Sequence, residues 1–223
     1  MNGKIVMECI DAAHTTIAQH HDEIAQLDQA IGDGDHVFNL TRGLEALIAM
    51  RSQIEGLEFQ PALSLSASKL LSTIGGSSGP LLASLLMGMA KTPAPELNSS
   101  SLSAMFKAGV AMMAARGKAG VGEKTMLDVL IPVSETFEQL TNTHVSSDQL
   151  LSAIKTRAED GMLATRDMIA TKGRASFLGE RAVGHIDPGA RSSQLIITAI
   201  CDLIAGKRDS HASDALEYAG RGA

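Results

Sequence analysis

The chain has 223 residues, of which 44% are hydrophobic and only 3% aromatic, and its formal net charge is −6. The chain therefore has enough apolar residues for one sizeable core. Because Ala, Leu, Ile and Met must fill this core, packed helices suit the composition better than a sheet. The acidic balance without a basic cluster argues against nucleic acid as a partner, and the longest apolar run, 81–90, is too short to cross a bilayer, so we expect no membrane association and a cytoplasmic location.

Apolar residues recur at helical spacing along most of the chain, with no alternating strand pattern and no internal repeat. We expect Ser146 or Ser147 to cap the helix that follows them, and the last helix to be mostly buried. This pattern predicts a single all-α domain over residues 1–223. The predicted helices cover residues 4–19, 21–29, 38–52, 61–74, 80–90, 101–116, 125–140, 151–169 and 189–204.

Three aspartates lie within eight residues, at Asp28, Asp33 and Asp35. Carboxylates this close repel one another, and a divalent cation with oxygen ligands is the usual remedy. The glycines on either side of Asp33 allow the tight backbone that aims the carboxylates at one point. A solvated acidic turn is the alternative, because Gly and Asp are common turn residues. An EF-hand is excluded, since its twelfth position would be Leu44 instead of Glu.

A glycine-rich segment, 75–80, has the sequence Gly-Gly-Ser-Ser-Gly-Pro and lies between two predicted apolar helices. Small residues expose backbone N–H groups, and the start of the next helix adds its positive dipole end, so the segment suits a phosphate. Pro80 fits the first helical position. The alternative is a helix C-cap followed by a turn. The segment matches neither the Walker pattern nor the dinucleotide fingerprint.

After a glycine-containing break at 117–122, the segment 122–126, Gly-Glu-Lys-Thr-Met, opens another helix. We expect that Thr125 could cap this helix and that Lys124 could simply be solvated.

A long stretch without helical pattern, 171–188, precedes the last helix. Loops of this length in compact domains are usually lids or binding loops. Arg174 could contact phosphates, or it could pair with Glu180 or Asp187 and only order the loop.

Together these motifs resemble the nucleotide-binding L subunit of dihydroxyacetone kinase, of the phosphoenolpyruvate phosphotransferase-dependent type. The matching segments occur in family order and span nearly the whole chain. They are 31–36, 75–80, 122–126, 172–181 and 184–189. The resemblance implies a barrel of about eight antiparallel helices, with the nucleotide site and a lid loop, about 171–188, at one end.

The resemblance also implies roles for individual residues. Asp28, Asp33 and Asp35 would hold the magnesium ions, two in number, that bridge the nucleotide phosphates. Arg174 would close the lid and take part in catalysis. The other residues implied to bind ADP or ATP are His36, Val37, Phe38, Asn39, Gly76, Ser77, Ser78, Gly79, Gly117, Met126, Asp187, Pro188 and Gly189.

By the same resemblance, the chain is a kinase subunit that acts only with partners. A K subunit would hold dihydroxyacetone, and an M subunit would recharge bound ADP from phosphoenolpyruvate. ATP-dependent relatives fuse the two halves in a longer chain, so a chain of this length favours the phosphotransferase-linked type. Two positions depart from the family pattern, which commonly has Asp at Glu123 and Ala at Ser77.

Two alternatives stay open at this point. The chain could serve an ATP-dependent kinase for another short ketose or polyol, such as erythrulose. It could instead be a nucleotide-sensing module that reports its ADP or ATP state to a transcriptional regulator, in which case it would bind nucleotide but support no phosphoryl transfer.

Overall fold

The computed structural model describes residues 2–76, 78–143 and 145–220, and all the regular structure in these residues is helical. The α-helices are α1 (Gly3–Gln19), α2 (His21–Ile31), α3 (His36–Ile48), α4 (Arg51–Glu55), α5 (Phe59–Thr73), α6 (Ser78–Lys91), α7 (Ser99–Gly117), α8 (Leu127–Asn142), α9 (Ser147–Ala164) and α10 (Pro188–Gly220). Two 3-10 helices, η1 (Thr165–Asp167) and η2 (Arg174–Ala182), lie between α9 and α10.

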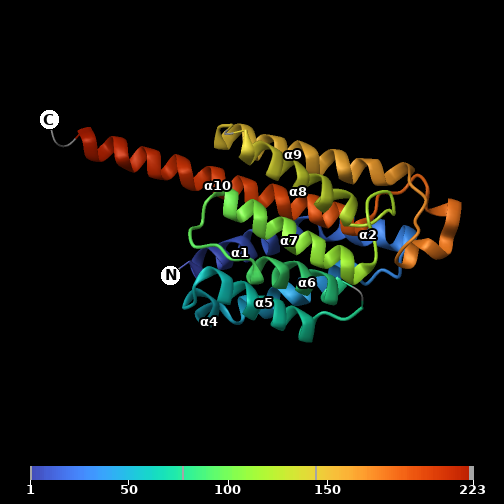
Figure 1. The fold of residues 1–223 in the computed structure, drawn as a ribbon. Coiled ribbons are helices and arrows are strands. Elements are labelled where there is room, and N and C mark those ends of the chain that lie inside the picture. Colours follow the sequence, from blue (N-terminus) through green and yellow to red (C-terminus); the bar gives the residue numbers. More distant parts are fainter. Residues whose placement is uncertain (1, 77, 144, 221–223) are drawn as a thin grey trace.

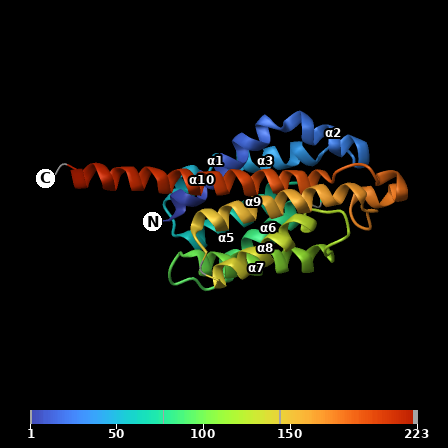
Figure 2. The same cartoon turned by 90° about the horizontal axis from the view of Figure 1, so that it is seen from above.

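The helices close into a ring. Going round it, α1 packs on α3, α3 on α5, and then each helix from α5 to α10 packs on the next, until α10 returns to α1 (Figures 1 and 2). The short helix α4 packs on α1 and α5, and α2 lies against α3 and α10. The prediction of a single all-α domain built as a helical barrel is confirmed.

Aliphatic and methionine side chains fill the ring, as the composition predicts. The largest cluster joins the helices from α1 to α6 and includes Met7, Ile24 and Leu47, and Met105 of α7 also lies in it. Where α6 packs on α7, a Cβ atom on Gly88 would lie 2.7 Å from the backbone oxygen of Ala108, so only glycine fits there. Non-polar burial therefore holds the wall of the ring together.

The ends of several helices follow local capping rules. Ser146 caps α9 in a capping box with Gln149, which confirms one of the two predicted caps. A second capping box, made by Asn98 and Ser101, starts α7 at Ser99, two residues before the predicted start. The predicted N-terminal position of Pro80 shifts slightly, because α6 already begins at Ser78.

Two predicted helices end differently. The predicted helix 38–52 breaks, since α3 ends at Ile48 and α4 begins at Arg51. The predicted helix 151–169 stops at Ala164, because the next residue, Thr165, directs its carbonyl oxygen to the buried Lys124 side chain and its hydroxyl to the backbone of residue 187. Contacts from distant residues thus override the helical pattern.

The last helix is longer and less buried than predicted. It runs to Gly220 instead of residue 204, and its C-terminal part projects beyond the ring (Figures 1 and 2). Leu195 and Cys201 are buried, but Ile204 is exposed. No helix in the described ranges is both long enough and apolar enough to span a membrane.

The loops that matter for function meet at the opposite end of the ring from this projection (Figure 1). We call this the loop end; it comprises residues 32–35, 75–76, 118–126 and 168–187. The last of these segments includes η2, which kinks at Gly179 and whose Ala175 and Ala182 pack against Ile31. The predicted loop 171–188 therefore contains a 3-10 helix fixed to the ring by a small apolar cluster.

Candidate functional site

A cavity of about 460 Å³ opens at the loop end. It is lined by residues from each of the sequence segments singled out above, although these are far apart in the chain. The predicted site residues that line it are Asp28, Asp33, Asp35, His36, Ser78, Gly117, Met126, Arg174, Asp187, Pro188 and Gly189. Three further cationic side chains, Arg116, Lys124 and Lys172, share the cavity.

Three consecutive residues that were predicted to bind the nucleotide, 37–39, do not line this cavity. The reason is that successive residues of a helix point in different directions. Val37 is completely buried in the core, whereas Phe38 is 58% exposed and its ring meets His21 edge to face, with centroids 5.0 Å apart. Asn39 is buried and accepts a hydrogen bond of 2.6 Å from Arg42. Their contact with a nucleotide stays a prediction.

The glycine-rich turn lies beside the acidic residues. A Cβ atom on Gly76 would lie 3.9 Å from the Asn39 side chain and 4.0 Å from the Asp35 carboxylate. Gly79 is buried within the first turn of α6, close to the backbone of Ile74. Ser77, also predicted to bind phosphate, lies outside the described residues.

The three aspartates form a compact acidic cluster. One carboxylate oxygen from each of Asp28, Asp33 and Asp35 lies within 4.8 Å of the other two. Asp28 is buried, its carboxylate accepts the backbone N–H of His36 at 2.9 Å, and a Cβ atom on Gly32 would collide with it. Hard oxygen donors in this arrangement suit Mg²⁺ or a similar divalent cation. The donor set therefore fits the predicted metal.

Arg174 contacts this acidic cluster directly. Its Nε lies 2.8 Å from a carboxylate oxygen of Asp33, so it does not order the loop by pairing with Glu180 or Asp187, the alternative raised from sequence. Both partners are exposed, and such a pair contributes little to stability. The pair instead fixes a position, because it joins η2 to a proposed metal ligand and both residues line the cavity.

His36 connects the acidic cluster to two other elements. Its Nε2 lies 2.9 Å from the hydroxyl of Ser192 on α10, and its Nδ1 lies 3.4 Å from the hydroxyl of Ser78 on α6. Burial lowers the pKa of the imidazole, although the charges of Asp28 and Asp35 act in the opposite direction. Burial therefore favours the neutral form of the ring.

Lys124 is not solvated, which corrects the expectation from sequence. Its side chain is 1% exposed, and Nζ donates to the backbone oxygens of Thr165 and His185, both at 2.5 Å. Burial lowers its pKa, against the charges of Asp187 and two other aspartates. Lys124 thus ties the loop after α7 to the end of α9 and to the segment that leads into α10.

Asp128 organises the same loop and was missed in the sequence. Its buried carboxylate accepts the backbone N–H groups of Gly122 at 2.5 Å and Thr125 at 2.7 Å. The Thr125 hydroxyl in turn accepts the N–H of Leu127 at 3.1 Å, but the N-cap of α8 is Met126, one residue later than the predicted cap. A signal was available, because Thr125 and Asp128 have the spacing of a capping box.

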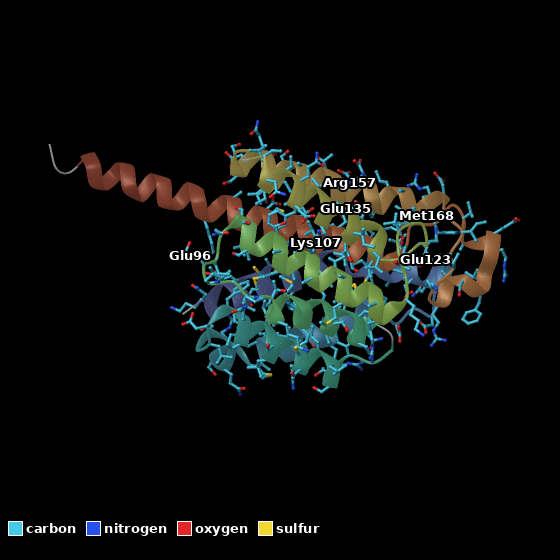
Figure 3. All side chains as sticks on the ribbon, in the orientation of Figure 1. Glu96, Lys107, Glu123, Glu135, Arg157 and Met168 are labelled. Carbon is cyan, nitrogen blue, oxygen red and sulfur yellow. The ribbon has the colours of Figure 1, made fainter. Side chains whose placement is uncertain are left out.

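Glu123 links this loop to the start of the predicted lid. Its carboxylate accepts the N–H of Gly120 at 2.7 Å and the hydroxyl of Thr171 at 2.9 Å, and it lies 3.6 Å from Nζ of Lys172. The Gly120 and Thr171 hydrogen bonds hold its pKa below the usual range. Figure 3 shows Glu123 at the loop end, where Met168 also lies.

Asp187 caps α10 and faces the same cavity. Its carboxylate accepts the backbone N–H of Ala190 at 2.7 Å. Burial raises its pKa to about 7; the charge of Asp128 adds to this rise, while the Ala190 N–H and Lys124 oppose it. The cavity therefore combines an acidic cluster suited to a metal, cationic side chains and the starts of α3, α6, α8 and α10. This combination suits an anionic ligand with its divalent cation.

Two subunits of known kinases are similar to this chain in sequence. The chain is 38% identical over 178 residues to the ADP-binding subunit DhaL of PEP-dependent dihydroxyacetone kinase 1 from Listeria innocua, covering 79% of this chain and 84% of that protein. It is 40% identical over 168 residues to the corresponding DhaL subunit of Escherichia coli, covering 74% and 80%.

The fold matches that of the dihydroxyacetone kinase from C. freundii, solved with AMP-PNP and Mg²⁺, with a TM-score of 0.70 at 21% identity. That match covers 89% of this chain and 34% of the kinase, so the chain spans about a third of that protein. The profile of the DAK2 domain matches residues 30–202. The chain therefore belongs to the DAK2 domain family.

Proposed function

We propose that this chain is the ADP-binding subunit of a dihydroxyacetone kinase. The observation that carries the proposal is the meeting of the acidic cluster, the start of α6 at Ser78 and Arg174 around one cavity. The names of the relatives that it matches over most of their length support the same conclusion.

In this proposal each wall of the cavity has its own role. Asp28, Asp33 and Asp35 hold Mg²⁺, which when bound neutralises charge on the phosphate oxygens. The turn ending at Ser78 holds the phosphates through its backbone N–H groups. Arg174 and the rest of η2 cover the site and exclude water, which limits wasteful hydrolysis. Two Mg²⁺ ions and an adenine site near Gly117 and Met126 complete the proposal.

We further propose that a separate K subunit presents dihydroxyacetone and that an M subunit recharges ADP from phosphoenolpyruvate. The relatives named as PEP-dependent ADP-binding subunits support this division of labour, since the chain covers most of their length.

Mass spectrometry of the purified protein tests this function. We expect ADP to copurify, to resist exchange with added ATP, and to become phosphorylated when phosphoenolpyruvate and the phosphotransferase components are added. Rapid exchange with ATP would instead favour an ATP-dependent kinase. Nucleotide binding without transfer to dihydroxyacetone in the presence of a K subunit would indicate a sensing module. Failure to bind ADP in saturating Mg²⁺ would contradict the proposal.

Arg174→Ala separates the role of the lid from folding. Since Arg174 is exposed and pairs only at the surface, we expect the melting temperature to change little. Phosphoryl transfer in the reconstituted system should fall by about a hundredfold, the usual cost of one lost donor at a developing charge. Turnover equal to that of the wild type would remove Arg174 from the mechanism.

A further inference from the structure

Ser192 is a buried hydroxyl for which the proposed function has no role so far. It lies in the first turns of α10 and is 3% exposed. Its Oγ has two partners within hydrogen-bond distance: Nε2 of His36 at 2.9 Å and the backbone oxygen of Gly189 at 3.0 Å. Gly189 itself lines the cavity.

These two contacts determine where the ring proton of His36 lies. A backbone oxygen can only accept, so the single proton of the Ser192 hydroxyl is donated to Gly189. The contact between Ser192 and His36 then requires His36 to donate from Nε2. A ring with one proton therefore carries it on Nε2, and Nδ1 then presents a lone pair towards the hydroxyl of Ser78.

The resulting chain of hydrogen bonds has one direction. Ser78 donates to His36, His36 donates to Ser192, and Ser192 donates to Gly189. It connects the starts of α6, α3 and α10, and each of these three helix starts contributes to the wall of the cavity. The same histidine donates its backbone N–H to the buried carboxylate of Asp28. The position of His36 thus affects both the phosphate side and the metal side of the site.

We propose that Ser192 is a positioning residue of the nucleotide site, which holds His36 with its ring proton on Nε2 and its Nδ1 directed at the glycine-rich turn. Without the Ser192 hydroxyl, Nε2 would be left without a partner in a buried position, which costs free energy. The His36 ring can lower this cost by rotating or by moving its proton to Nδ1. Either change alters the ring nitrogen that faces Ser78. The expected effect on ADP binding rests on the proposed function, whereas the assignment of the His36 tautomer does not.

Nitrogen-15 NMR of the full-length protein without nucleotide tests the tautomer. We expect the His36 signals of the wild type to show a protonated Nε2 and an unprotonated Nδ1. Ser192→Ala should shift these signals towards a mixture of tautomers. Ser193→Ala, the same chemical change on the neighbouring residue, should leave them unchanged. A wild-type His36 that carries its single ring proton on Nδ1 would overturn the proposal.

Calorimetric titration with ADP in saturating Mg²⁺ tests the consequence for binding. We expect Ser192→Ala to weaken ADP binding by about tenfold, the lower end of what loss of a supporting contact costs at such sites. Ser192→Thr, which keeps the hydroxyl, should restore most of the affinity, and Ser193→Ala should match the wild type. Circular dichroism confirms that each variant is folded.

A double variant shows whether Ser192 acts through His36. In a His36→Ala background, Ser192→Ala should cause no further loss of ADP affinity. An additional tenfold loss there, or an unchanged affinity of the single Ser192→Ala variant, would overturn the positioning role. If the wild type binds no ADP, the proposed function fails, and the NMR measurement still decides whether Ser192 sets the tautomer of His36.

Discussion

Along the wall of the ring the large fully buried side chains are apolar, such as Met7, Ile54 and Met105, whereas at the loop end they include Lys124 and Asp128. Non-polar burial is favourable wherever it occurs and needs little geometric accuracy. A buried charge is costly unless it is paired or hydrogen bonded. Both groups meet this condition through backbone atoms: Lys124 donates to the distant residues Thr165 and His185, and Asp128 accepts from the loop just before it.

This difference explains how one domain combines stability with a fixed site. The wall supplies most of the free energy of folding, while the loop end uses hydrogen bonds that hold each loop in one arrangement. The loops are therefore positioned before a ligand arrives, which reduces the cost of ordering them on binding. Four predictions test this difference between the wall and the loop end.

Substituting one exposed aspartate of the acidic cluster should have the largest effect. We expect Asp35→Ala, and likewise Asp33→Ala, to abolish Mg²⁺-dependent ADP binding, because a metal ligand is lost. Helicity should be retained, since both side chains are exposed. Asp160→Ala, an exposed aspartate on α9, is the matched control. Calorimetry with ADP in saturating Mg²⁺ provides the test, and unchanged affinity would refute the metal assignment.

Removing the buried charge at the loop end should strongly reduce stability. Lys124→Met keeps most of the side chain but leaves the backbone oxygens of Thr165 and His185 without their donor. We expect the free energy of unfolding to fall by about 3 kcal/mol. Lys118→Met is the control, because Lys118 also has positive φ but is exposed, and we expect a change within about 0.5 kcal/mol. Urea denaturation of both variants would measure the change in the free energy of unfolding. Equal changes in the two variants would contradict the role of burial.

The pH dependence of stability should report on Asp187. Its pKa is about 7 in the folded chain, against an ordinary value of 3.8. Between these values the folded state binds a proton that the unfolded state has released, so this group makes the free energy of unfolding fall as pH rises from about 4 to about 7. Asp187→Asn keeps an acceptor for Ala190 but does not titrate, so its profile should fall less steeply. Urea denaturation at a series of pH values would measure both profiles. The same pH dependence in the wild type and in Asp187→Asn would contradict the raised pKa.

The smallest effect is expected at the wall. Lys107 of α7 donates to both carboxylate oxygens of Glu138 on α8, at 2.8 and 2.7 Å, and Figure 3 shows Lys107 on the outside of the ring. Both side chains are exposed, so Lys107→Ala should reduce the free energy of unfolding by no more than about 0.5 kcal/mol. ADP affinity should not change. A loss comparable to that of Lys124→Met would mean that the wall and the loop end are not distinct.

The sequence predicts most of the helices because apolar periodicity is a local property. It also singles out the acidic cluster, Ser78 and Arg174, since their residue types and neighbours are unusual. What it does not predict depends on distant contacts. The end of α9 is set by Lys124 and by the backbone of residue 187. Neither contact can be recognised from the apolar pattern of the sequence near Thr165.

Ser192 and Lys124 show the same limit within the site. An isolated serine or lysine in a sequence is usually solvated, and only the fold shows that these two are buried and hydrogen bonded. Ser192 meets His36 across 156 positions of sequence. The direction of that hydrogen-bond chain follows from the acceptor-only backbone oxygen of Gly189, which becomes visible only in three dimensions.

The most direct test of the metal and nucleotide site is a crystal structure of the protein with ADP and Mn²⁺, with the metal located by its anomalous scattering. The proposal predicts manganese bound by the carboxylates of Asp28, Asp33 and Asp35, with the ADP phosphates against the turn that ends at Ser78. Manganese bound elsewhere, or ADP outside this cavity, would contradict it.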